Sequence, residues 1–116
     1  MENFPFIIIF ITVPTEKEAQ KISDKLLQEK LVACVNIIKE VNSFFWWKNK
    51  IESANEILLV VKTQSKFFDD IVNAVKQLHS YDVPEIIAVP IINANKDYLD
   101  WIKENVKKNN ILEKNY

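Results

Sequence analysis

Two long extended segments joined by a turn of two residues constrain the fold of this chain more than any other feature. The segments cover about residues 33–47 and 50–63, and Lys48-Asn49 lies between them. A two-residue hairpin turn needs a residue with φ > 0, and the chain has no glycine, so we expect Asn49 to adopt that conformation. The pattern predicts an antiparallel hairpin whose arms are each about 14 residues long.

This hairpin is too long for the domain that carries it. At about 3.3 Å per residue an arm spans roughly 45 Å, whereas a compact chain of this length has a diameter of roughly 35 Å. We therefore expect the tip, with Phe44, Phe45, Trp46 and Trp47, to extend beyond the core. Exposed aromatic clusters are typical of protein interfaces, which predicts a homo-oligomer.

The two tryptophans of the tip follow each other in the sequence. Because side chains alternate across a strand, we expect one of Trp46 and Trp47 to face inward and the other outward. Interface packing is one interpretation of the pair, and an aromatic platform for a ligand is the alternative.

The remaining segments alternate between strand and helix patterns. A continuous β-branched and aromatic run at residues 6–13 predicts a strand buried on both faces, and residues 86–92 predict another strand. Apolar residues at helical spacing predict helices over 19–27, 68–78 and 98–106. This β-α-β-β-α-β order with a further helix predicts one α+β domain over 1–116, a ferredoxin-like βαββαβ sandwich with an extended hairpin and an extra C-terminal helix.

Several polar residues are placed to begin the helices. Thr15 and Glu18 have the spacing of a capping box, in which each side chain accepts a hydrogen bond from a free backbone N–H. Ser65 and Asn95 are expected to cap the second and third helices. The polar tail carries Ile111, Leu112 and Tyr116, which we expect to dock weakly.

Charge and composition exclude several classes of function. The net charge is −1, and all 15 basic residues are lysines, so nucleic-acid binding is not expected. The apolar run at residues 6–11 is too short to span a membrane and lacks the basic start of a signal peptide, so we expect no membrane partner and a cytoplasmic location. The single cysteine, Cys34, excludes an internal disulfide, and its apolar neighbours predict core packing.

The only histidine is the first candidate for a metal contact. His79 and Glu85 lie six residues apart across Pro84, and together they offer two ligands for Cu²⁺ or another divalent metal. The alternative is a histidine whose hydrogen bonds fix the loop. No other cofactor is indicated.

A second candidate site depends on assembly. Lys62, Thr63 and Tyr81 lie at strand ends and loops, and with Trp47 they are candidates to line a cleft between subunits. Ordinary loop and interface hydrogen bonding is the alternative. The sequence has no serine–histidine–aspartate order, phosphate-binding loop or dinucleotide glycines, so we predict no catalytic residues and no enzymatic activity.

The chain also carries an ordered series of motifs: Ile11-Thr12-Val13-Pro14, residues 31–37, residues 43–51, Glu56, Lys62-Thr63, residues 79–86 and Tyr98-Leu99-Asp100-Trp101. Together, over about residues 6–107, these motifs resemble the CutA divalent-cation tolerance family. The resemblance implies a ferredoxin-like fold, a homotrimer, a likeness to nitrogen-signalling PII proteins and a role in tolerance of divalent metals, notably copper.

One departure from the family bears on copper. Bacterial relatives can carry a cysteine at the position of Ile11, and isoleucine cannot coordinate a metal. Three hypotheses stay open: a trimer that responds to metal ions, a PII-like sensor of small molecules, and a trimeric scaffold or interaction module with no direct metal role.

Overall fold

The computed structural model describes residues 3–107, and the tail residues Ile111, Leu112 and Tyr116 lie outside them. The elements in chain order are β1 (Phe6–Val13), α1 (Glu16–Gln28), β2 (Cys34–Trp47), β3 (Lys50–Gln64), the 3₁₀ turn η1 (Ser65–Phe67), α2 (Phe68–Leu78), β4 (Ile86–Pro90) and α3 (Lys96–Asn105). The predicted order of strands and helices is confirmed. Within residues 3–107 no helix is long and apolar enough to cross a membrane.

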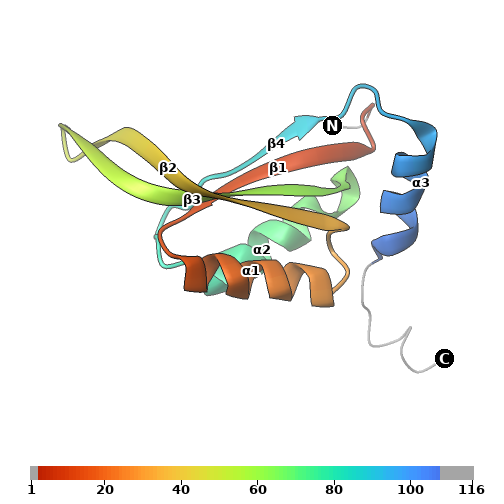
Figure 1. The fold of residues 1–116 in the computed structure, drawn as a ribbon, viewed down its shortest axis with the longest axis horizontal. Coiled ribbons are helices and arrows are strands. Elements are labelled where there is room, and N and C mark those ends of the chain that lie inside the picture. The colour runs from red at the N-terminus through yellow and green to blue at the C-terminus, as the bar shows by residue number, and fades with distance from the viewer. Residues whose placement is uncertain (1–2, 108–116) are drawn as a thin grey trace.

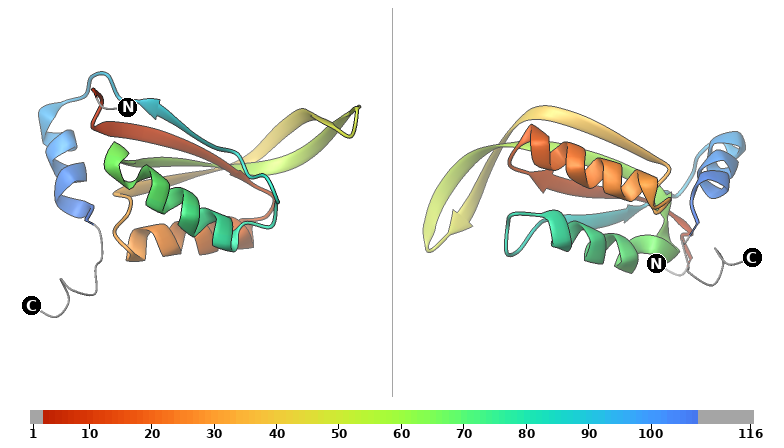
Figure 2. Two further views of the ribbon diagram at one scale, coloured as in Figure 1. Left: turned by 180° about the vertical axis from the view of Figure 1, so that it is seen from behind. Right: turned by 90° about the horizontal axis from the view of Figure 1, so that it is seen from below.

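The four strands form one antiparallel sheet in the order β2-β3-β1-β4. Helices α1 and α2 lie side by side against one face of this sheet, and α3 lies at the end of the sheet where β1 begins (Figures 1 and 2). The opposite face carries neither α1 nor α2, and we call it the helix-free face. The chain therefore has two main layers, one of strands and one of helices.

The core lies between the sheet and the first two helices. In β1 the residues Ile7, Ile9, Ile11 and Val13 are buried, and the residues between them are only partly buried. The prediction that this strand is buried on both faces is wrong for the single chain. The helices cover one face, and the hydrophobic residues of the other face stay accessible.

Helix α1 shows how a glycine-free chain ends a helix. The N–H of Lys30 donates to the carbonyl of Leu27, and the N–H of Leu31 donates to that of Leu26. This is the Schellman pattern, which requires a left-handed residue at the position of Lys30. Lys30 accordingly has φ of 57° although it carries a side chain.

The hairpin of β2 and β3 extends beyond the rest of the sheet and gives the molecule a long axis of 51 Å (Figure 1). A bulge between Ile38 and Val41 bends β2, and Glu40 in the bulge has φ of 62°. Lys48 and Asn49 have φ of 50° and 65° and form the predicted two-residue turn. The prediction for Asn49 is confirmed, and Lys48 was not foreseen.

Both tryptophans of the tip are exposed, Trp46 at 72% and Trp47 at 58%. The prediction that one of them faces inward is wrong, because the core ends before the hairpin does. Phe44 is also 74% exposed.

The predicted cap of the second helix is wrong, and that of the third is right in position only. Ser65 starts the 3₁₀ turn, α2 follows at Phe68, and no side-chain cap is formed. Asn95 occupies the N-cap position of α3, but its side chain makes no capping hydrogen bond.

Candidate functional site

The loop between α2 and β4 is held through His79, whose side chain is fully buried. Nε2 of His79 lies 2.7 Å from the carbonyl oxygen of Thr12 in β1, and Nδ1 lies 3.1 Å from the backbone nitrogen of Tyr81. A carbonyl only accepts and a backbone N–H only donates, so Nε2 carries the proton and Nδ1 accepts. Both ring nitrogens are therefore used within the chain.

Glu18 of α1 holds the next residue of the same loop. Its carboxylate accepts hydrogen bonds from the backbone N–H and the hydroxyl of Ser80. The Thr15 side chain accepts from the Glu18 N–H at 3.2 Å, so half of the predicted capping box is confirmed. The other half is wrong, because the Glu18 carboxylate is directed to a loop 62 residues away instead of to its own helix end.

Tyr81 completes the attachment of the loop. Its hydroxyl donates to Oε2 of Glu56, a buried residue of β3, at 2.9 Å. The pKa of Tyr81 is raised from 10.0 to about 12. Burial is the largest cause, and the hydrogen bond to Glu56 and the negative charge of Glu56 add to it. The ring of Tyr81 also lies against that of His79, with 4.9 Å between the centroids. Glu56 pairs with Val41 beside the bulge, so this bond joins the loop to the base of the projecting hairpin.

The two predicted metal ligands, His79 and Glu85, are not arranged as a metal site in the single chain. His79 has both ring nitrogens in hydrogen bonds, whereas Glu85 lies on the exposed surface. Among residues 3–107 no three or more histidine, cysteine, aspartate or glutamate side chains are grouped to hold a metal. Ile11 is completely buried in the core. These contacts agree with the alternative in which His79 fixes the loop, and metal binding stays a prediction.

The four predicted cleft residues are not brought together within one chain. Trp47 pairs with Lys50 at the tip, and Lys62 lies twelve positions after Lys50 along β3, which is roughly 40 Å of extended strand. Thr63 is fully buried, and its hydroxyl donates to the Leu31 carbonyl at 2.6 Å. Thr63 therefore has a structural role in the chain, and any cleft shared by Lys62, Tyr81 and Trp47 needs more than one subunit.

Two polar side chains, those of Asn36 and Cys34, lie near Lys62 on the helix-free face. The Lys62 ammonium donates to Oδ1 of Asn36 at 2.6 Å, and Sγ of Cys34 lies 3.9 Å from the same oxygen. Cys34 is partly exposed and lies opposite Lys62 in the sheet register. The prediction that Cys34 packs in the core is wrong, because its side of β2 faces away from α1 and α2.

Apolar side chains dominate the rest of the helix-free face. They follow from the sheet register and from the alternation of side chains along each strand: Ile8 and Phe10 of β1, Ile38 of β2, Leu58 and Val60 of β3, and Ile87 and Val89 of β4. Ile87 is 52% exposed and Ile38 is 47% exposed. A continuous apolar face of this kind on a single chain is typical of a surface covered by another protein molecule.

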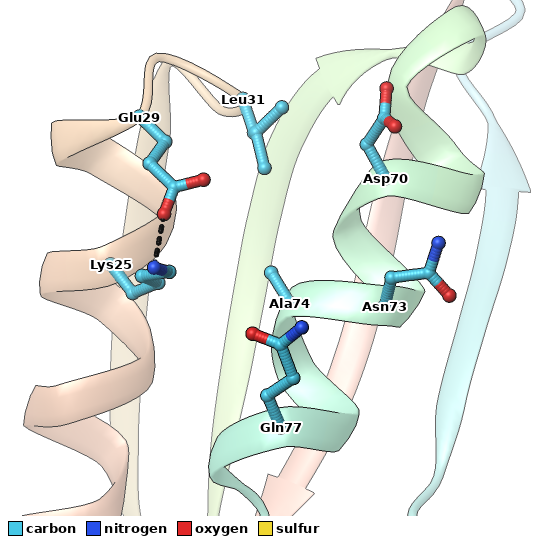
Figure 3. Close-up of a pocket in the computed structure, with 7 residues that line it drawn as sticks. All are labelled: Lys25, Glu29, Leu31, Asp70, Asn73, Ala74 and Gln77. Atoms are coloured by element: carbon cyan, nitrogen blue, oxygen red, sulfur yellow. Dashed lines mark ion pairs between the residues drawn. The ribbon is translucent and has the colours of Figure 1, made fainter. Parts of the chain in front are cut away.

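Two clefts lie elsewhere. One lies between α1 and α2 and has a volume of about 210 Å³. Leu31 and Ala74 are part of its lining, and the Lys25–Glu29 ion pair lies on its α1 side (Figure 3). The other has a volume of about 580 Å³ beside β4 and the start of α2, and Pro5, Ile7, Phe68 and Ala88 contribute its apolar lining. Neither cleft contains a residue that the sequence singled out as a site.

Sequence reasoning missed the roles of Glu18 and Glu56. Glu18 looked like an ordinary capping residue, and Glu56 was noticed only as part of a motif. For Glu56 the available signal was its position directly before the apolar run at residues 57–61, since a buried carboxylate needs hydrogen-bond donors from elsewhere in the fold. Glu18 lies among charged residues and gave no such signal. The positions of those donors, Ser80 and Tyr81, depend on tertiary structure.

The family model described as CutA1 divalent ion tolerance protein matches residues 7–105. The divalent-cation tolerance protein CutA of Archaeoglobus fulgidus is 48% identical over 107 residues, which cover 92% of this chain and all of that protein. Protein CutA 1, chloroplastic, of Oryza sativa is 38% identical over 104 residues, and the match covers 90% of this chain but 59% of the rice protein.

Solved structures share the fold as well as the sequence. The crystal structure of CutA1 from Oryza sativa superimposes with a TM-score of 0.88 at 38% identity, covering 91% of this chain and 97% of the rice chain.

Proposed function

This chain belongs to the CutA1 divalent ion tolerance family, and from that premise we propose that it acts as a homotrimer in divalent-cation tolerance and not as an enzyme. The observation that carries the proposal is the apolar helix-free face, continuous with an aromatic hairpin that projects from the core. The subunit number comes from the family resemblance. The strand order β2-β3-β1-β4 supports the ferredoxin-like arrangement.

Assembly accounts for the apolar surface, the projecting hairpin and the open sheet edges of the single chain. Covering Phe10, Val60 and Ile87 removes apolar surface from water, at about 25 cal/mol per Å². Phe44 and Trp46 at the projecting tip stay largely exposed within residues 3–107. A second copy of the chain would supply a surface that covers them. Both edges of the sheet, β2 and β4, are also available for contact with another subunit.

A pair of substitutions tests whether the helix-free face joins the subunits. Lysine at Ile87 places a charge on that face, whereas lysine at Leu27 places one on the exposed side of α1, where Leu27 is 40% exposed. We expect Ile87→Lys to raise the subunit dissociation constant at least tenfold and Leu27→Lys to leave it unchanged, as measured by analytical ultracentrifugation. Equal association of both variants would show that the interface lies elsewhere.

The role in metal tolerance is supported by the names of the relatives, and direct copper binding is a separate matter. His79 and Glu85 stay the two donors that we predict for any direct contact. Binding through His79 requires the loss of its hydrogen bond to Thr12 or to Tyr81. A second function, a trimeric scaffold without a direct metal role, is favoured by this engaged state of His79.

Copper calorimetry on the wild type and on His79→Ala distinguishes these two functions. The engaged ring and the missing cysteine at residue 11 predict that neither form binds Cu²⁺ with submicromolar affinity. Tight binding that His79→Ala abolishes would establish His79 as a ligand and contradict the scaffold. Tight binding that survives the substitution would place the site elsewhere.

Location and the sensing of small molecules are further parts of the proposal. A cytoplasmic location stays a prediction, and the rice relative is named as chloroplastic. A PII-like sensor would use clefts between subunits, where Lys62, Tyr81 and Trp47 can meet only across an interface.

A further inference from the structure

Lys62 is a charged residue within the apolar helix-free face. In the sheet register it lies between Ile8 of β1 and Cys34 of β2, and Val60 precedes it on the same face of β3. Its side of the sheet is the side away from α1 and α2. In the single chain the residue is half-buried, so water still reaches its ammonium group.

The only hydrogen bond that the Lys62 side chain makes within residues 3–107 is to a neutral group. Nζ donates to the amide oxygen of Asn36 at 2.6 Å. The lysine ion pairs within residues 3–107 involve Lys25, Lys39 and Lys96, and none of them includes Lys62. An ammonium has three donors, so two are left to water, and the amide does not neutralise its charge.

Covering this face changes the surroundings of that charge. A second subunit against Ile8 and Val60 would remove water from the ammonium of Lys62. An unpaired charge that is taken out of water is strongly unfavourable unless an opposite charge accompanies it. The neighbours of Lys62 named above, Ile8, Cys34, Asn36 and Val60, include no carboxylate that could supply it.

We propose that Lys62 is an anion-binding residue of the assembled protein, with a carboxylate or phosphate oxygen contacting its ammonium group. This inference rests on the proposed oligomer. The anion has two possible sources, a carboxylate side chain of a second copy or a small free anion that enters between subunits. Asn36 orients the ammonium in either case by fixing one of its N–H groups.

The experiment uses the full chain with Lys62→Met and a control, Lys76→Met, on the exposed face of α2. Inorganic phosphate is titrated by calorimetry at constant ionic strength, and subunit association is measured by ultracentrifugation. A free anion predicts that the wild type and Lys76→Met bind phosphate and that Lys62→Met binds at least tenfold more weakly. A carboxylate from a second copy predicts no phosphate binding but at least tenfold weaker association of Lys62→Met alone.

Lys62→Gln is the second variant, because glutamine removes the charge and can still donate to Asn36. It should reproduce the effect of methionine if charge is what matters. Unchanged association of both variants, without phosphate binding by the wild type, would overturn the inference while the oligomer stands. A monomeric wild type would instead overturn the proposed function, and the inference would fall with it.

Discussion

Glu18 shows how much a single buried side chain contributes to this fold. Its carboxylate accepts two hydrogen bonds from Ser80, and the carboxylate lies 3.9 Å from Nδ1 of His79. The residue thereby joins the start of α1 to the loop before β4. A carboxylate in such a position stabilises the fold only as long as its donors are present.

Replacing Glu18 by alanine should lower the free energy of unfolding by about 2 kcal/mol, because it leaves the loop donors without their charged acceptor. Glu16→Ala is the control, since Glu16 is also in the first turn of α1 but forms an exposed ion pair with Lys39. Its effect should stay below about 0.5 kcal/mol. Urea unfolding of the three proteins measures both, and equal losses would show that Glu18 acts only at the helix end.

The raised pKa of Tyr81 predicts its titration. Folding favours the protonated phenol, so this stabilisation is fully present below pH 10.0 and is lost as the pH rises through about 12. Absorbance of phenolate near 295 nm should show an ionisation step for Tyr81 at a pH well above 10.0. Tyr81→Phe should remove that late step, and its persistence in the variant would assign the raised pKa to another tyrosine.

At the scale of the element, the helix and strand patterns predicted most of the fold because burial of apolar side chains is periodic. The hairpin turn at Asn49 was predictable from the absence of glycine. The left-handed residues Lys30, Glu40 and Lys48 were not, since lysine and glutamate carry no preference for φ > 0. Their conformations follow from a helix end, a bulge and a turn that only the tertiary structure fixes.

Glycine should change the free energy of unfolding in opposite directions at the end of α1 and in its middle. Lys30→Gly should raise the free energy of unfolding by about 1 kcal/mol, because glycine adopts the left-handed conformation without strain. Lys21→Gly, in the middle of the same helix, should lower it by about 1 kcal/mol. Thermal unfolding measures both, and a destabilised Lys30→Gly would mean that the lysine side chain stabilises the helix end.

At the scale of the whole molecule, the sheet is covered on one face and bare on the other. The sequence predicted a strand buried on both faces, and the single chain buries only one. The same mismatch applies to Trp46 and Trp47, which were expected to alternate between core and solvent and are both exposed. The candidate site was harder to predict than the fold, because Lys62, Tyr81 and Trp47 can share a cleft only between chains.

The mass of the protein in solution tests the proposed assembly most directly. Light scattering coupled to gel filtration at micromolar concentration should give three times the chain mass of 13.6 kDa. That result would account for the helix-free face and the projecting hairpin together. A mass of 13.6 kDa at the same concentration would mean that both surfaces stay open to water, and would contradict the account.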